Sequence, residues 1–395
     1  MNVFEKDSAY IAGTYARFPL ALTHGRGALV YDTEGREYID LSSGIAVNTF
    51  GYSDPVWAQA VAEQAGKLQH TSNLFYSAPC ARLAEMLCTR TGMKKVFFSN
   101  SGAEANECAI KCARKYAADR YGSDRCQIIT LKNSFHGRTV TTLSATGQDS
   151  FHELFHPLTE GFRYARASHM EDIAQLTEDG KVAAIMIELV QGEGGVNPLE
   201  RDYVTALAAY AQEKDILLIV DEVQTGNGRT GALYAYMNYG ITPDIVTTAK
   251  GLAGGLPLGA TLFGEKTEGV LTPGTHGSTF GGNPVACAGA ISILDRLDAV
   301  LLEQVKEKSI YIREELTDAP GILSVSGMGL MLGIETVADA GAVIAACREK
   351  GVLVIRAKNK VRLLPPLNIE VGLIKRAVAV IREVCKDLGN KEDHA

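Results

Sequence analysis

Short apolar runs alternate with amphipathic segments through the middle of the chain. Six of these runs have the length and the β-branched content of strands, and their nearly unbroken hydrophobicity is typical of strands covered on both faces. They span residues 94–100, 126–132, 182–190, 215–222, 244–250 and 258–264. Residues 103–122 and 199–215 lie between runs and carry apolar positions at helical spacing. This alternation predicts an α/β fold with a mostly parallel, doubly wound sheet.

The two ends of the chain follow a different pattern. Residues 29–44 are predicted to form a hairpin with a turn near Glu34–Gly35, and Asp54 before Pro55 predicts the start of a helix. From about residue 285 the pattern predicts one long helix, then strands at 329–335, 351–357 and 361–367, and a final helix. We therefore expect a large domain of residues 51–284 and a small α+β domain of residues 1–50 and 285–395.

Composition and charge change this picture by excluding classes of partner. The chain has 395 residues, of which 46% are hydrophobic and 22% charged, as in a globular protein with room for two cores. Its net charge of −7, without clusters of lysine and arginine, argues against nucleic acids and anionic membranes as partners. No apolar run approaches the roughly 18 residues of a membrane span, and the N-terminus lacks the features of a secretory leader. We expect a cytoplasmic protein with a small-molecule ligand.

Neither a metal nor a dinucleotide is expected as that ligand. The eight cysteines lack zinc-finger spacing and are predicted to be small core residues, and His136 and His152 are not spaced as metal ligands. The segment GNGRTG, residues 226–231, fits the glycine pattern of dinucleotide-binding loops. No acidic residue stands about 20 positions beyond its first glycine to hold a ribose, which disfavours that interpretation.

Lys250 is the one charged residue between positions 245 and 260. Because desolvation disfavours an ammonium group, its side chain either extends to water or is neutral and nucleophilic. Its run ends at Lys250, and the run before it ends at Asp221–Glu222. Ligands of doubly wound sheets bind at the carboxyl ends of the strands, so we expect Lys250 and Asp221 to meet at one edge. Taken alone, Asp221 would more simply be a turn or cap residue.

The segment SNSGAEANE, residues 99–107, adds a candidate anion site. It places Ser101, Gly102 and Ala103 where a predicted strand turns into a predicted helix, so that free N–H groups and the helix dipole face the same edge. A plain strand-to-helix turn is the alternative. An amine, an anionic partner for a ring nitrogen and a phosphate site together are what pyridoxal phosphate requires.

Seven segments resemble, in order and spacing, the motifs of the class III pyridoxal-phosphate aminotransferases. They are FFSNSGAEANECAIK, SFHGRT, ELVQGEGG, DEVQTGNGRTG, TTAKGLAGGLPLGA, GSTFGGNP and VRLLPPL, and the resemblance runs from about Tyr15 to Pro366. It implies a fold-type I homodimer that uses pyridoxal 5′-phosphate. It also implies a large cofactor-binding domain, a small domain made of both termini, and an active site shared between subunits.

The resemblance implies a role for each residue around the cofactor. Lys250 is the lysine that binds the cofactor covalently and moves protons, and Asp221 keeps the ring nitrogen protonated. Phe135 and Val223 pack on opposite faces of the ring, although each taken singly would be assigned to core packing. Gln224 pairs with the ring hydroxyl.

Phosphate and dimer contacts are implied in the same way. Ser101, Gly102 and Ala103 match the residues that bind the phosphate. Thr279 matches a threonine that reaches the phosphate of the other subunit.

Substrate contacts follow from further matches. Arg138 and Arg362 resemble the two arginines that bind substrate carboxylates, a role suited to the guanidinium fork. Glu193 matches a glutamate that pairs with Arg362 until an α-carboxylate displaces it, although a solvated loop acid is the alternative. Tyr15 stands where related enzymes place a tyrosine near the substrate tail, and Ser278 is assigned to the same site.

The choice of amino donor depends on Gly44, which replaces a tyrosine that contacts the free α-amino group in ornithine enzymes. The missing ring would leave space for an acyl group, although Gly44 could also be a simple strand-end glycine. We therefore expect transfer of the δ-amino group of N2-acetylornithine to 2-oxoglutarate, as in arginine biosynthesis. Ornithine, succinylornithine, succinyldiaminopimelate and 4-aminobutyrate stay open as donors, and a glutamate-1-semialdehyde aminomutase is a more distant alternative.

Overall fold

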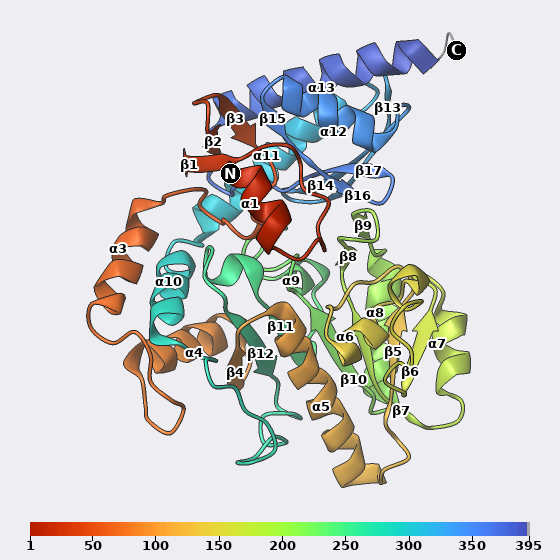
Figure 1. The fold of residues 1–395 in the computed structure, drawn as a ribbon. Coiled ribbons are helices and arrows are strands. Elements are labelled where there is room, and N and C mark those ends of the chain that lie inside the picture. Colours follow the sequence, from red (N-terminus) through yellow and green to blue (C-terminus); the bar gives the residue numbers. More distant parts are fainter. Residues whose placement is uncertain (393–395) are drawn as a thin grey trace.

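A seven-stranded sheet forms the centre of the structure, a computed structural model that describes residues 1–392 (Figure 1). Its strand order is β4-β12-β11-β10-β7-β5-β6; β12 is antiparallel to both neighbours, and the other pairs are parallel. The prediction of a mostly parallel sheet is confirmed. The strands are β4 Lys95–Ser99, β5 Gln127–Leu131, β6 Phe162–Ala165, β7 Val182–Ile187, β10 Leu217–Asp221, β11 Ile245–Thr248 and β12 Gly259–Phe263.

All six predicted strands of this sheet are present, as are the two predicted helices, α5 (Gly102–Tyr121) and α8 (Arg201–Glu213). The seventh strand, β6, was not predicted because it is a four-residue edge strand interrupted by Arg163. The predicted end of β11 was wrong by two residues. β11 stops at Thr248, and Lys250 opens a short 3₁₀ turn with a φ of 45°.

Alternate residues of the central strands pack into two different apolar clusters. In β7, Ile185 and Ile187 belong to one cluster and Met186 to the other. Leu207 of α8 belongs to the first cluster and Ile110 of α5 to the second, so these helices cover opposite faces of the sheet. Because strand side chains alternate between faces, a strand in this position must be apolar throughout. Burial of each isoleucine contributes roughly 1.5–3 kcal/mol.

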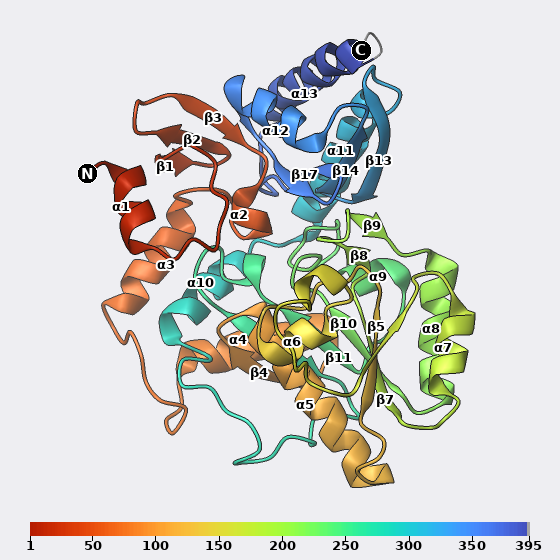
Figure 2. The same cartoon turned by 45° about the vertical axis from the view of Figure 1, so that its right-hand side comes forward.

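The two ends of the chain share a sheet beside the central one (Figures 1 and 2). The predicted hairpin is confirmed: β2 and β3 are antiparallel, and Gly35 turns between them with a φ of 79°. β3 then pairs in parallel with β15 near the C-terminus. The strands of this sheet are β1 Leu22–Arg26, β2 Leu29–Asp32, β3 Glu37–Asp40 and β15 Val352–Leu353. A third sheet contains β13 Ile322–Met328, β14 Met331–Thr336, β17 Lys360–Leu363 and β16 Ile355–Ala357, in that order.

The expectation of one long helix from about residue 285 was wrong. The structure has two helices there, α10 (Pro284–Leu294) and α11 (Ala299–Leu316). Asp298 starts the second helix, because its side chain accepts a hydrogen bond from the N–H of Leu301 at 2.8 Å. α10 packs against α3 (Pro55–Ala65) and α4 (Ala78–Thr91), whereas α11 packs against α13 (Val371–Glu392) and β13. The predicted cap at Asp54 is confirmed by its bond from the N–H of Trp57.

The remaining elements complete the layers around the sheets. They are α1 Val3–Tyr10, α2 Ser43–Ala46, α3 Pro55–Ala65, α4 Ala78–Thr91, α6 Val140–Ala145, α7 Met170–Thr177, α9 Ala235–Tyr239, α12 Ala340–Glu349, α13 Val371–Glu392, and the short strands β8 Val190–Gln191 and β9 Asn197–Pro198. Within residues 1–392, no helix combines the length and the apolar character that crossing a membrane requires.

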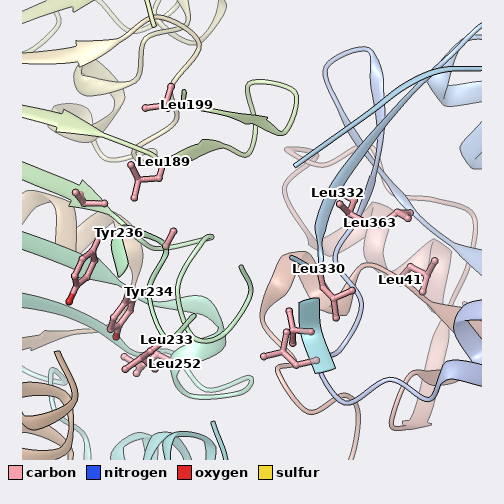
Figure 3. Close-up of a cluster of buried hydrophobic side chains, with 14 of the residues drawn as sticks. Leu41, Leu189, Leu199, Leu233, Tyr234, Tyr236, Leu252, Leu330, Leu332 and Leu363 are labelled. Atoms are coloured by element: carbon pink, nitrogen blue, oxygen red, sulfur yellow. The ribbon is translucent and has the colours of Figure 1, made fainter. Parts of the chain in front are cut away.

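The largest apolar cluster extends from the central sheet into the terminal part of the chain. Figure 3 shows Tyr234 and Leu252 on one side of this cluster, and Leu330, Leu332 and Leu363 on the other. The two parts are therefore joined by packed side chains, which fixes how residues from each part meet.

Candidate active site

A cavity of about 410 Å³ opens where β4, β5, β7, β10 and β11 end. Strands that point the same way end at the same edge of a sheet, so the residues that follow them converge there. The cavity is lined by Val47, Asn100, Ser101, Gly102, Ala103, Asn106, Phe135, His136, Gly137, Arg138, Glu188, Asp221, Val223, Gln224, Ala249, Lys250, Gly255, Leu256, Pro257 and Leu258.

Lys250 lies in this cavity with the properties of a nucleophilic amine. Burial lowers its pKa, and the nearby carboxylates of Glu193 and Asp221 offset this effect only in part. A lysine in such a place gives up its proton more readily than one in water. The backbone of Lys250 is left-handed and turns the chain away from β11. This backbone conformation costs about 1–2 kcal/mol for a residue with a side chain.

Asp221 is held as a hydrogen-bond acceptor. Its Oδ2 accepts from Asn106 Nδ2 and pairs with His136 Nδ1, both at 2.8 Å, and its Oδ1 accepts from the N–H of Val223 at 2.9 Å. Burial would lower the pKa of His136, but its hydrogen bond to Asp221 and the charge of that carboxylate raise it above the usual value. The carboxylate is 4% exposed and cannot rotate without losing these bonds. It is therefore oriented for a cationic partner in the cavity.

The turn between β4 and α5 has the geometry of an anion-binding site. Ser101 caps α5, and its Oγ accepts from the N–H of Glu104 at 3.2 Å. In the described part of the chain, the N–H groups of Gly102 and Ala103 have no acceptor. A side chain at Gly102 would put its Cβ 2.6 Å from Val223 Cγ1, so only glycine permits this approach. The cradle therefore offers free donors at the positive end of a helix, as a phosphate requires.

Phe135 and its neighbours shape the opposite side of the cavity. The N–H of Phe135 donates to Glu188 Oε2 at 2.9 Å, which fixes its backbone. Arg138 is exposed, and its guanidinium lies 4.3 Å from the ring centroid of Phe151 and 5.6 Å from that of Phe135. Val223 lines the same cavity. An amine, an oriented carboxylate, an anion cradle and a ring-lined space thus occur together, and they fit pyridoxal phosphate.

The sequence did not indicate three of the residues around this cavity. Asn106 and His136 orient Asp221, and Glu188 holds both Phe135 and, at 3.4 Å, the N–H of Gly192. Burial raises the pKa of Glu188 to about 7. The available signal for Asn106 was a polar residue on the apolar face of a predicted helix, and the signal for Glu188 was an acid within the apolar run 182–190.

Glu193 and Arg362 form an ion pair beside the cavity. Arg362 Nη1 donates to Glu193 Oε1 at 2.6 Å and to Gln224 Oε1 at 3.0 Å. Burial would raise the pKa of Glu193, but the charge and the hydrogen bond of Arg362 outweigh it and lower the pKa. The side chain of Arg362 is 3% exposed and that of Glu193 is 30% exposed. The arginine is thus fixed in the core, whereas the glutamate faces partly outward and is the partner that can leave.

Gln224 connects this pair to the cavity. It lines the cavity wall, and its amide packs so closely on Gly192 that a Cβ there would lie 2.7 Å from it. Arg362 Nε is buried and has no partner in the described residues, which leaves one further donor of the guanidinium available.

Besides Glu193 and Arg362, three expected site residues, Tyr15, Ser278 and Thr279, do not line the cavity of this chain. Tyr15 is 72% exposed, and Thr279 is also exposed. Ser278 accepts from Asn100 Nδ2 at 3.3 Å and from the N–H of Gly281 at 3.0 Å, which stabilises the loop that carries Thr279.

Comparisons with known proteins identify the family of this chain. The sequence pattern of the family described as Aminotransferase class-III matches residues 10–385. The chain is 50% identical over 392 residues to the acetylornithine aminotransferase of Haemophilus ducreyi, covering 98% of this chain and 99% of that protein. It is 45% identical over 377 residues to the acetylornithine aminotransferase of Aquifex aeolicus, covering 95% of this chain and 99% of that protein.

Solved structures give the same result. The ornithine aminotransferase of Toxoplasma gondii, described with partial occupancy of PLP at its active site, superposes with a TM-score of 0.94 at 32% identity, covering 99% of this chain and 95% of that chain. The N-acetylornithine aminotransferase of Stenotrophomonas maltophilia K279a superposes with a TM-score of 0.84 at 36% identity, covering 97% of this chain and 98% of that chain.

The fold and the cavity define an aminotransferase of fold-type I that uses pyridoxal phosphate. The chain belongs to the class-III aminotransferase family. Its resemblance in seven motifs therefore led to the correct family, fold and cofactor.

Replacing Asp221 by asparagine should slow turnover by roughly 10²–10³-fold, because the protonated ring nitrogen of the cofactor would lose the carboxylate that pairs with it. Turnover and the visible absorbance of the bound cofactor check this, and the absorbance should persist because the cradle is unchanged. Glu222→Gln is the matched control. Glu222 is an adjacent buried carboxylate whose partners are Thr225 and Tyr236, and it does not line the cavity. Similar losses of turnover in both variants would contradict the role of Asp221.

Proposed function

We propose that this chain transfers the δ-amino group of N2-acetylornithine to 2-oxoglutarate, giving N-acetylglutamate 5-semialdehyde and glutamate. The ion pair of Glu193 with Arg362 is the observation that carries the proposal. The acetylornithine aminotransferases at 50% and 45% identity support the choice of donor.

The ion pair addresses the difference between the two amino donors. Glutamate carries an α-carboxylate beside its reacting carbon, whereas the δ-carbon of acetylornithine carries none. A permanently free Arg362 would favour glutamate and would leave an unpaired buried cation beside the other donor. Glu193 neutralises this cation when acetylornithine is bound, and an incoming α-carboxylate takes its place.

The other residues divide the chemistry of the transfer. Pyridoxal phosphate supplies an aldehyde that takes up the amino group and a ring that accepts the electrons of the deprotonated carbon. Lys250 is the base that takes the proton from this carbon and returns it. Asp221, oriented by Asn106 and His136, keeps a proton on the ring nitrogen. Arg138 binds the distal carboxylate of the dicarboxylate substrate.

Space near Gly44 supports an acylated donor. Gly44 does not end a strand as one alternative required: it lies four residues beyond β3, in a turn where it has a φ of 61°. A Cβ at this position would lie 3.6 Å from Asn48 Nδ2, an ordinary contact, so the left-handed backbone rather than crowding favours glycine there. The absence of a side chain also leaves room for the acyl group of the donor.

We also propose that the enzyme is a homodimer in which Thr279 completes the partner's site. The adjacent Phe280 is 59% exposed, and Leu74, Phe75 and Tyr76 are 88%, 70% and 106% exposed. Asn73 donates to the carbonyl groups of Ser278 and Gly281, so these apolar side chains lie on neighbouring segments. An exposed patch of this kind is typical of a subunit interface.

Purified enzyme mixed with N2-acetylornithine and 2-oxoglutarate should form glutamate, and Lys250→Ala should abolish both this turnover and the yellow absorbance of the covalently bound cofactor. The reason is that no other amine lines the cavity among residues 1–392. A rate of glutamate formation higher with ornithine or 4-aminobutyrate than with N2-acetylornithine would overturn the substrate assignment. Appreciable transamination by Lys250→Ala would overturn the role of the lysine.

Glu193→Gln should leave Arg362 without its anion, which strengthens glutamate binding and weakens the acetylornithine half-reaction. We expect a differential on the order of 1–3 kcal/mol, because the pair is largely shielded from water. Single-turnover measurements of each half-reaction check this. Equal effects on the two donors would leave Glu193 with a structural role only.

Mixed dimers test the shared site. Lys250→Ala chains and Thr279→Asp chains are each expected to be inactive, the latter because a carboxylate would repel the phosphate. Random pairing of the two should restore about a quarter of the wild-type activity, since half of the dimers would contain one intact site. Dimers that carry both substitutions on each chain are the control. Zero activity despite demonstrated mixed dimers would contradict a contribution of Thr279 across the interface.

A further inference from the structure

Arg229 is a buried cation in the GNGRTG segment, the segment whose glycine pattern suggested a dinucleotide. The residue is 2% exposed, and burial lowers its pKa to about 9. Within residues 1–392, no carboxylate forms an ion pair with it. Burial of a guanidinium is costly unless its donors are bonded, so the partners of Arg229 indicate what it is for.

Those partners are two backbone carbonyl groups from the terminal part of the chain. Arg229 Nη1 donates to the carbonyl of Leu330 at 3.1 Å and also to the carbonyl of Pro365. In return, the N–H of Leu330 donates to the carbonyl of Arg229 at 2.9 Å. The segment that follows the cofactor residues is thereby bonded to the segment that follows Arg362.

The two carbonyl groups stand at the open end of the β14–β17 ladder. In this ladder Leu332 is opposite Leu363 and Gly333 is opposite Arg362, so continuing the register would bring Leu330 opposite Pro365. Pro365 has no N–H and cannot continue the ladder. Arg229 supplies the missing donors and holds the end of both strands from outside the sheet.

Close backbone approach accompanies these bonds. Gly329 has a φ of 56°, and a Cβ there would lie 2.5 Å from the carbonyl oxygen of Arg229. A Cβ at Gly228 would lie 2.8 Å from Leu367 Cδ1. Gly228 of GNGRTG and Gly329 thus allow the two parts of the chain to pack closely at this point.

We propose that Arg229 is a positioning residue that fixes the strand carrying Arg362 relative to the cofactor residues, and so determines how tightly the enzyme binds an amino-acid α-carboxylate. The inference rests on the roles proposed above for Arg362 and Glu193. Two-point binding of a carboxylate by a guanidinium depends strongly on alignment. N2-acetylornithine carries no carboxylate on its reacting δ-carbon, so its half-reaction does not use this contact.

The test compares Arg229→Gln and Arg229→Lys in the cofactor-loaded enzyme. We expect Arg229→Gln to raise the glutamate concentration needed for half-maximal rate of its half-reaction by about tenfold, because misplacement of a binding group by a fraction of an ångström has effects of this order. The corresponding value for N2-acetylornithine should change less than about twofold on the same argument. Arg229→Lys retains a donor for one carbonyl and should give an intermediate value.

Binding without turnover provides a second readout. Maleate, an unreactive dicarboxylate, can be titrated into each variant and followed by the absorbance of the bound cofactor, and its dissociation constant should rise in parallel with the glutamate value. Lys308→Gln is the matched control. Lys308 is a buried lysine of α11 that donates to the carbonyl of Leu367 at 2.8 Å, a bond that does not reach the cofactor segment. Its loss should lower the melting temperature without altering the ratio between the two donors.

The inference would be overturned if the Arg229 variants changed the half-maximal concentrations of glutamate and N2-acetylornithine by equal factors. It would also be overturned if Lys308→Gln changed the ratio of these two concentrations as much as Arg229→Gln does. If Arg229→Gln does not fold, Arg229→Lys alone must shift the ratio or the inference fails. Glu193→Gln measured in parallel separates the two proposals. If Glu193→Gln shifts the ratio between the two donors and Arg229→Lys does not, only the role of Arg229 is contradicted. If neither variant shifts the ratio, the exchange of Glu193 for a substrate carboxylate is contradicted as well.

Discussion

The chemistry of this protein depends on the parallel pairing of β10 with β11. In their register Asp221 is opposite Thr247, so the carboxylate that ends one strand lies near the lysine that follows the other. The same direction of β4, β5 and β7 brings the helix N-terminus, Phe135 and Glu188 to this edge. Burial at the end of an apolar sheet lowers the pKa of Lys250, and the hydrogen bonds around Asp221 fix the orientation of its buried carboxylate.

A second constraint is that the two parts of the chain meet beside this edge. Arg362 comes from the antiparallel sheet of the terminal part, whereas Glu193 and Gln224 follow strands on the cavity side. With the role proposed for Arg362, one buried guanidinium serves both substrate selection and the contact between the two parts of the chain. Arg362 must be held in place, whereas Glu193 must be able to move away. Their side chains are 3% and 30% exposed, respectively, which agrees with these different requirements.

The sequence was sufficient where one local rule decided the outcome. The uniform hydrophobicity of residues 182–187 and 217–221 predicted buried strands, and Asp54 before Pro55 predicted a helix start. It was insufficient at the edge strand β6, which pairing with β5 decides, and at the helix break before Asp298, where a local cap interrupts a continuous apolar pattern. In the site, the positions of Lys250 and Asp221 could be predicted because both lie near the ends of predicted strands. The hydrogen bonds of Asn106 and His136 to Asp221 could not be predicted, because these residues are 115 and 85 positions away from it in the sequence.

In the proposed mechanism, Arg362 changes partner from Glu193 to a substrate carboxylate within one otherwise fixed cavity. Crystal structures of the cofactor-loaded enzyme, alone and with bound maleate, test it most directly. We predict that maleate contacts the guanidinium of Arg362, that Glu193 lies beyond 4 Å from it, and that Asp221 and the turn at Ser101–Ala103 do not move. Maleate bound in the cavity with Glu193 still paired to Arg362 would contradict the account.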